Sequence, residues 1–196
     1  MKEFFKRNKK LLLISLTIFL IFAIGGAIFS FISAGEHYGM ISKALFQAKA
    51  NGTLVSNDDV PKSTSLGLFL HNIIADFAVI AGGLLFSVIS VLIVIFNAVI
   101  IGIPFGNDFV YSVVTILPHG IIEYSALIFA LAAAFKITQI EIKMIKNRRF
   151  RDTLNEHKRE LKDILIMIVI VAVLLVIAAV IEANFVEPIM LWYYGI

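Results

Sequence analysis

Long apolar segments alternate with shorter charged segments along this chain. Residues 11–33 form the first apolar segment, and residues 164–182 form the last. A helix that crosses a bilayer needs about 20 predominantly apolar residues, so each of these segments is predicted to span the membrane once. The first is longer than the usual apolar region of a cleaved signal peptide, which favours a retained anchor.

The charged segments indicate on which side of the membrane each part lies. Residues 1–10 carry five basic side chains against one acidic, and residues 137–163 carry eight against five. Because Lys and Arg are enriched in cytoplasmic loops, both segments are predicted to be cytoplasmic, the second as a helical arm. Residues 34–65 carry three basic and three acidic side chains, which suits an outer loop.

The middle of the chain must then return from the outside to the cytoplasm. Residues 66–136 therefore cross the membrane an odd number of times, and their 71 residues suit three crossings of about 20 residues each. The predicted fold class is an all-α polytopic membrane protein with about five transmembrane helices, its N-terminus inside and its C-terminus outside. Residues 1–196 are predicted to form a single membrane domain, because no segment is left for a soluble one.

The breaks within the middle of the chain are predicted from its small and polar residues. Six of these share one face of a continuous helix: Asn72, Asp76, Gly83, Ser87, Ser90 and Asn97. This alignment favours one long helix over residues 66–101 rather than a hairpin at Gly82 and Gly83. Two glycines and a proline in residues 102–107 predict a loop. A further break is expected before Pro118, because proline suits the first position of a helix.

The composition agrees with a membrane protein. Apolar residues make up 60% of the chain and charged residues 16%, and the mean hydropathy is +0.94. Cysteine is absent, which excludes disulfides and thiolate metal sites. The basic residues gather beside apolar spans, as topology determinants do, and do not indicate a nucleic-acid partner. No nucleotide-binding motif or nucleophile elbow is present, and no cofactor is predicted.

Ionisable residues inside the predicted spans form the candidate site. Residues 66–135 contain no Lys or Arg, and Asp76, Asp108 and Glu123 are their only charged side chains. Because an ionisable group in hydrocarbon costs about 2.5–3.5 kcal/mol on insertion scales, such residues face a bundle interior. We predict an intramembrane polar core of six residues: Asn72, Asp76, Asn97, His119, Glu123 and Glu182. His119 and Glu123 lie on one helical face, which continues into a stripe of alanines.

Three interpretations of this polar core stay open. The residues can form a hydrogen-bonded structural core, or they can line a path for protons or ions. Alternatively, His119 and Glu123 can share a hydrolytic metal ion, with His71 or Asp76 as a third ligand. Against the metal site, the chain has no His-Glu-x-x-His motif and four histidines in all.

Residues 117–123 read Leu-Pro-His-Gly-Ile-Ile-Glu, which resembles the signature of the stage II sporulation protein M family of membrane proteins. The signature residues are Pro118, His119, Gly120 and Glu123. Other features follow the family's order: Asn72, Asn97 with Gly102, and the closing segment Ala178-Ala179-Val180-Ile181-Glu182. Ala98 departs from the family, in which glycine is common at this position. The resemblance covers about residues 66–188.

The resemblance implies an organising role rather than a catalytic one. The founding member belongs to a membrane complex that drives engulfment in sporulating bacteria, beside secreted partners that act on peptidoglycan, and is regarded as a scaffold. Relatives occur in bacteria and archaea that never sporulate, so sporulation itself is not implied. The expected function is a scaffold or organiser in an envelope-associated complex, with no catalytic activity of its own.

The expected location is the cell (plasma) membrane, as a multi-pass protein. The expected partners are the lipid bilayer and either further copies of the chain, as a homo-oligomer, or other envelope proteins. The alternative function is a small transporter or permease subunit with a polar path through His119 and Glu123. An intramembrane metal-dependent hydrolase is the third possibility.

Overall fold

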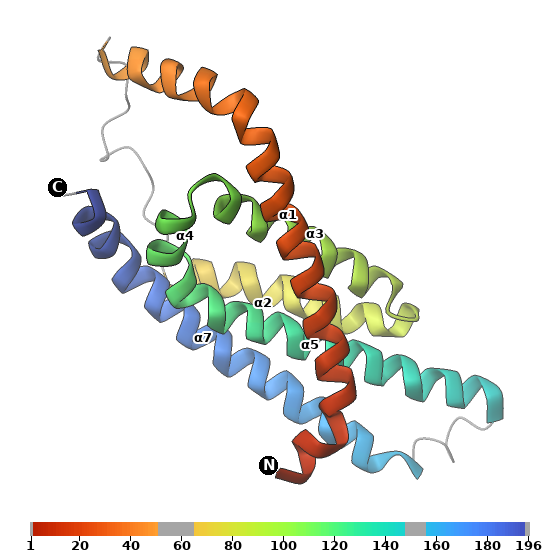
Figure 1. Ribbon diagram of the computed structural model, residues 1–196. Helices are drawn as coiled ribbons and strands as arrows, with labels where there is room; N and C mark the ends of the chain where they lie inside the picture. Colours follow the sequence, from red (N-terminus) through yellow and green to blue (C-terminus); the bar gives the residue numbers. More distant parts are fainter. Residues whose placement is uncertain (1, 51–64, 148–155, 195–196) are drawn as a thin grey trace.

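The computed structural model describes residues 2–50, 65–147 and 156–194. These residues form helices joined by short turns, with no strand among them. In chain order the elements are α1 (Lys2–Ala50), α2 (Ser65–Ala81), the 3-10 helix η2 (Gly82–Leu85), α3 (Val88–Asn107), α4 (Phe109–Thr115), α5 (Leu117–Asn147) and α7 (Lys158–Tyr194). The all-α prediction is confirmed (Figure 1).

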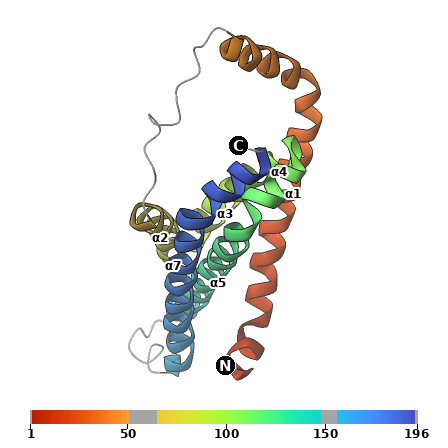
Figure 2. The same cartoon turned by 90° about the vertical axis from the view of Figure 1, so that its left-hand side faces the viewer.

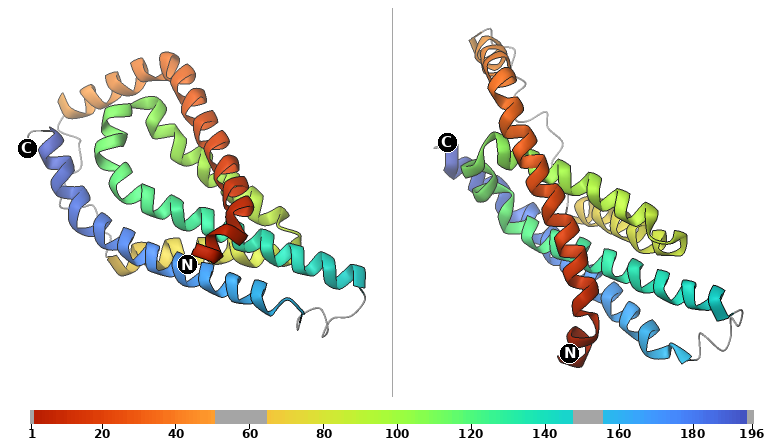
Figure 3. Two further views of the ribbon diagram at one scale, coloured as in Figure 1. Left: turned by 60° about the horizontal axis from the view of Figure 1, so that its bottom comes forward. Right: turned by 45° about the vertical axis from the view of Figure 1, so that its right-hand side comes forward.

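Four of the described helices are long and apolar enough to cross a membrane. They lie in α1, α3, α5 and α7, and a shorter apolar stretch covers residues Phe69–Leu85. The shorter stretch and α3 run antiparallel, as do α5 and α7 (Figures 1 and 3). The described residues therefore form a polytopic membrane protein with four helices of membrane-spanning length and one shorter apolar helix.

The predicted continuous helix over residues 66–101 is wrong. α2 ends at Ala81, and the chain reverses through η2 and two residues in the left-handed region, Phe86 (φ 55°) and Ser87 (φ 57°). Ser90 Oγ donates to the carbonyl of Val79 at 2.6 Å and so joins the two arms of this hairpin. A Cβ on Gly82 would lie 2.6 Å from Ser90 Oγ, so the hairpin needs a glycine there.

The small and polar residues that align on one helical face serve the turn instead. Thr138 of α5 donates to the carbonyl of Gly83 at 2.8 Å, and its hydroxyl lies 2.7 Å from that of Ser87. These side chains satisfy backbone and hydroxyl groups that a chain reversal between two apolar helices leaves without helical partners. Small and polar residues suit both a packed helix face and a tight hairpin. Their helical spacing alone therefore favoured a continuous helix where the chain forms a hairpin.

The predicted loop over residues 102–107 is also helical. α3 continues through Pro104 to Asn107, and the turn comes at Asp108, whose side chain accepts from the N–H of Tyr111 at 2.9 Å. Gly102 and Gly106 lie one turn apart and face α1. A Cβ on Gly102 would collide with the carbonyl oxygen of Ala23, and one on Gly106 with that of Ala27. The glycines bring two helices close together, as small residues do in membranes, and do not end α3.

The helix α1 extends well beyond the other helices. Measured along the helix, which bends toward both ends (Figure 1), its 49 residues are about 74 Å long, far more than a hydrocarbon core of about 30 Å. Figures 1 and 2 show its C-terminal part standing away from the bundle. The predicted outer loop 34–65 is thus helical as far as Ala50, while residues 51–64 lie outside the described residues. The predicted arm 137–163 consists of the ends of α5 and α7, and residues 148–155 also lie outside the described residues.

The central helix of the bundle is α5. Half of its most apolar stretch is buried, against 17% for α1. Its alanine stripe, Ala126, Ala130 and Ala134, has no exposed surface. A Cβ on Gly83 would lie 2.7 Å from the carbonyl oxygen of Ala134, so the hairpin tip packs directly on the α5 backbone. The break before Pro118 is confirmed, because α4 ends at Thr115 and α5 begins at Leu117.

Candidate functional site

A polar cluster joins α2 to α5 inside the bundle. The amide Nδ2 of Asn72, two turns into α2, donates to Oε1 of Glu123 on α5. Because α5 begins at Leu117, His119 and Glu123 both belong to this helix and lie one turn apart on the same face. Two residues that are 51 positions apart in the chain are therefore in direct contact.

Further ionisable groups surround Glu123. Asp76, one turn after Asn72, is 5% exposed, and its carboxylate is close enough for its charge to act on Glu123. Glu182 of α7 acts in the same way on both Glu123 and His119. Three helices thus contribute carboxyl groups to one region, where repulsion between negative charges grows as the dielectric falls. A proton or a cation held among them would relieve that repulsion.

Two polar atoms of this region lack a hydrogen-bond partner among the described residues. They are Oδ2 of Asp76 and Nδ1 of His119, and both are buried. A buried polar atom without a partner costs about 1–3 kcal/mol, so most folded proteins carry few of them. These two atoms give the cluster hydrogen-bonding capacity that the fold itself does not use.

Two of the candidate residues from the sequence, Asn97 and His71, do not take part in this cluster. Asn97 donates to the carbonyl of Ile93 at 2.8 Å, so its amide is used within its own helix, α3. His71 is exposed on α2, beside rather than inside the cluster. Within the described part of the chain, no three His, Asp or Glu residues are grouped in a way that could hold a metal ion.

A second polar cluster, which the sequence did not indicate, ties α1, α5 and α7 together. Asp163 accepts from Arg7 Nη2 at 2.7 Å and from Lys136 Nζ at 2.9 Å, and Lys136 also donates to Oδ1 of Asn8. Asp163 is 1% exposed and Lys136 is 5% exposed. We call these residues, Arg7, Asn8, Lys136 and Asp163, the clamp. The sequence feature that could have indicated the clamp is Lys136, the first basic residue after a long segment that contains no Lys or Arg.

The two clusters lie at opposite ends of the membrane-length segments. Glu123 and Lys136 are thirteen residues apart on α5, which corresponds to about 20 Å. The apolar run of α7 begins directly after Asp163, and that of α1 begins at Leu11, four residues after Arg7. The clamp therefore lies where three apolar helices reach one membrane boundary, and the Asn72–Glu123 cluster lies in the opposite half.

A bundle of membrane-length apolar helices with buried polar residues between them defines a polytopic integral membrane protein. Residues 15–186 match the family model described as stage II sporulation protein M, so the chain belongs to this family. The resemblance seen in residues 117–123 is thereby confirmed. An uncharacterized protein of the archaeon Methanocaldococcus jannaschii is 29% identical over 121 residues, 59% of this chain and 66% of that protein. The chain thus spans slightly less than two thirds of that relative. No solved structure matches the chain.

Proposed function

We propose that this protein is a scaffold or organiser of an envelope-associated complex in the cell membrane, without catalytic activity of its own. The observation that carries the proposal is α1, which is about 74 Å long and leaves the bundle as a helix up to Ala50. A helix of this length, anchored by the rest of the chain, reaches well outside a bilayer. A partner protein on the predicted outer face can be held there.

The packing of the transmembrane part supports a rigid anchor. Gly26, Gly102 and Gly106 hold α1 and α3 in backbone contact, and the clamp fixes α1 to α5 and α7. A cavity between α1 and α5 opens at the outside of these two helices. Helices held together by backbone contact and by buried ion pairs suit a component that positions others.

The proposal is tested by photo-cross-linking in native cells. A photo-reactive residue is placed at Lys49, near the end of α1, and for comparison at Ile21, which is 60% exposed in the middle of the apolar run. We expect a discrete protein adduct from position 49 and lipid adducts from position 21. The same adduct partner should co-purify with the wild-type chain in mild detergent. Lipid adducts at both positions, together with solute flux in proteoliposomes, would show that the transporter alternative is correct.

The transporter alternative has one specific observation in its favour. Asp76 and His119 carry buried polar atoms without partners among the described residues, beside Glu123 and Glu182, and groups of this kind mark intramembrane proton and ion paths. We therefore propose five of the six predicted core residues as the site to test: Asn72, Asp76, His119, Glu123 and Glu182. The Asn72–Glu123 hydrogen bond is its centre.

Replacing Glu123 distinguishes the two functions. Glu123→Gln keeps an acceptor for Asn72, so we expect unchanged stability and, for a scaffold, unchanged complementation of a strain that lacks the protein. Glu123→Leu leaves the Asn72 amide buried without its acceptor, and we expect a loss of about 2 kcal/mol in the free energy of unfolding. Stability is measured by denaturant titration in detergent.

The matched control is Asn184→Ala, two residues beyond Glu182 on α7, where the exposed amide donates to the carbonyl of Val180 within its own helix. This change should leave both stability and complementation intact. Loss of complementation in Glu123→Gln at wild-type stability would contradict the scaffold and support a titrating group at this position.

A further inference from the structure

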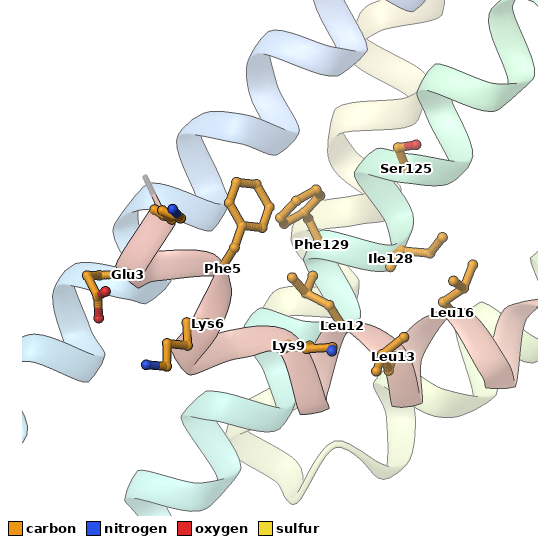
Figure 4. Close-up of a pocket in the computed structure, with 11 residues that line it drawn as sticks. Glu3, Phe5, Lys6, Lys9, Leu12, Leu13, Leu16, Ser125, Ile128 and Phe129 are labelled. Atoms are coloured by element: carbon orange, nitrogen blue, oxygen red, sulfur yellow. The ribbon is translucent and has the colours of Figure 1, made fainter.

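A cavity of about 710 Å³ opens between the first turns of α1 and the middle of α5. It is unrelated to the polar core, because its α5 residues, Ser125, Ile128 and Phe129, lie on a different face from Glu123. Figure 4 shows the rings of Phe5 and Phe129 next to one another, with Leu12 and Leu16 further along α1. The ring centroids of Phe5 and Phe129 are 6.4 Å apart.

The cavity is charged at one end and apolar at the other. Lys2, Lys6 and Lys9 line it together with one acid, Glu3. Figure 4 shows Glu3 and Lys6 at one end and Leu16 at the other. Leu16 lies seven residues beyond Lys9, or about 10 Å deeper along α1. The charged end therefore lies at the membrane boundary set by the clamp, and the apolar end lies within the hydrocarbon.

The lysines of the cavity are available to a ligand. No carboxylate among the described residues forms an ion pair with Lys2, Lys6 or Lys9, whereas the neighbouring Arg7 is held by Asp163. With Glu3 counted against the three lysines, the lining is net positive. A positive opening over an apolar floor is complementary to a molecule with an anionic head and a hydrocarbon tail.

A second cavity, of about 570 Å³, lies on the other side of the same lysines. Lys6, Lys9 and Leu13 line both cavities, and Ile14 and Ile18 continue the second one along α1. The lining of the second cavity comes from α1 alone and also includes Arg7 and Lys10, so basic side chains border both cavities. A ligand with one head and two hydrocarbon chains matches this arrangement better than one with a single chain.

We propose that this region of α1 binds an anionic phospholipid of the predicted cytoplasmic leaflet. The phosphate lies at Lys6 and Lys9, one acyl chain lies in the groove of Leu12, Leu16 and Phe129, and the other lies beside Ile14. Basic pockets between transmembrane helices bind lipid head groups in this way. The site selects an anionic head group over a neutral one, and it holds the start of α1 against α5.

The proposal is tested by native mass spectrometry of the full chain in detergent. Phosphatidylglycerol and phosphatidylcholine are added at equal concentration, and the ratio of the two bound lipids is measured. We expect phosphatidylglycerol to be preferred about 30-fold, since each lysine near an anionic head group contributes roughly fivefold. The double variant Lys6→Gln/Lys9→Gln should reduce the preference to near one. Lys158→Gln/Lys162→Gln, an exposed pair on α7 outside both cavities, should retain it.

Two further measurements address the acyl chain. Ser125→Phe adds bulk to the groove without changing its charge, and we expect it to reduce retention of phosphatidylglycerol at least fivefold. Sodium phosphate should not compete with the lipid. Equal retention of both lipids by the wild type, a preference that survives in Lys6→Gln/Lys9→Gln, full retention by Ser125→Phe, or competition by phosphate would each overturn the proposal.

Discussion

Asp163→Asn is expected to reduce the free energy of unfolding by about 3–5 kcal/mol, the loss seen when one partner of a buried ion pair is removed. Asp163 is 1% exposed and is the counter-charge of both Arg7 and Lys136. Asparagine fills the same space but leaves Lys136 buried as an uncompensated cation. The measurement is a denaturant titration of the purified protein in detergent.

Two variants define the cause of that loss. Glu156→Gln removes an exposed acid from the same end of the molecule and should change stability by less than about 0.5 kcal/mol. Lys136→Met/Asp163→Leu removes both buried charges, while Arg7, with 37% of its side chain exposed, can still reach water. We expect the double variant to be more stable than Asp163→Asn. If it is less stable, the clamp contributes through more than charge compensation.

Gly102→Leu is expected to separate α1 from α3 and to cost about 3 kcal/mol, the upper part of the range for overpacked cores. A Cβ on Gly102 collides with the backbone carbonyl of Ala23, which cannot move aside as a side chain can. The larger leucine side chain must therefore displace a whole helix. The expected result is an earlier unfolding transition in detergent, measured by the same titration.

The control for this change is Gly25 of α1, beside the tightly packed Gly26, where an added Cβ would meet nothing within 4 Å. Gly25→Ala should stabilise the protein by about 0.5–1 kcal/mol, because alanine restricts the unfolded chain more than glycine does. Gly102→Ala should destabilise it. Changes of the same sign at the two positions would contradict the packing of α1 on α3.

The sequence predicted those features that depend on the length of an apolar run or on a local break in a helix. Apolar runs of about 20 residues identified the first and last spans, and Pro118 identified the start of α5, because each of these features acts locally. Residues 102–107 were misinterpreted because a glycine can end a helix or bring two helices together. Only the partner helix decides between the two, and the partner, α1, is about 80 residues away in the chain.

The role of each polar residue also depends on which helix packs against it, and helical spacing alone does not give that partner. The prediction that Asn72 and Glu123 face one another requires a contact between α2 and α5, and the structure has that hydrogen bond. Asn97 has the same helical periodicity as Asn72, but its amide donates to a carbonyl within its own helix, α3. The hairpin at residues 82–87 reverses the chain, so α3 does not continue the polar face of α2. The contacts of Lys136 do not follow from local spacing, because its partners, Asn8 and Asp163, are 128 and 27 residues away in the chain.

The hairpin between α2 and α3 has a consequence for how the chain enters the membrane during synthesis. Its tip exposes Leu84, Leu85 and Phe86, and no charged residue lies between Asp76 and Asp108. Positive charges at the end of a segment normally determine which way the segment is inserted. The hairpin has none, so its orientation must be imposed by its neighbours: the basic start of α1, already synthesised, and the basic end of α5, still to come. The hairpin is therefore expected to take its direction from α1 and α5 rather than from charges of its own.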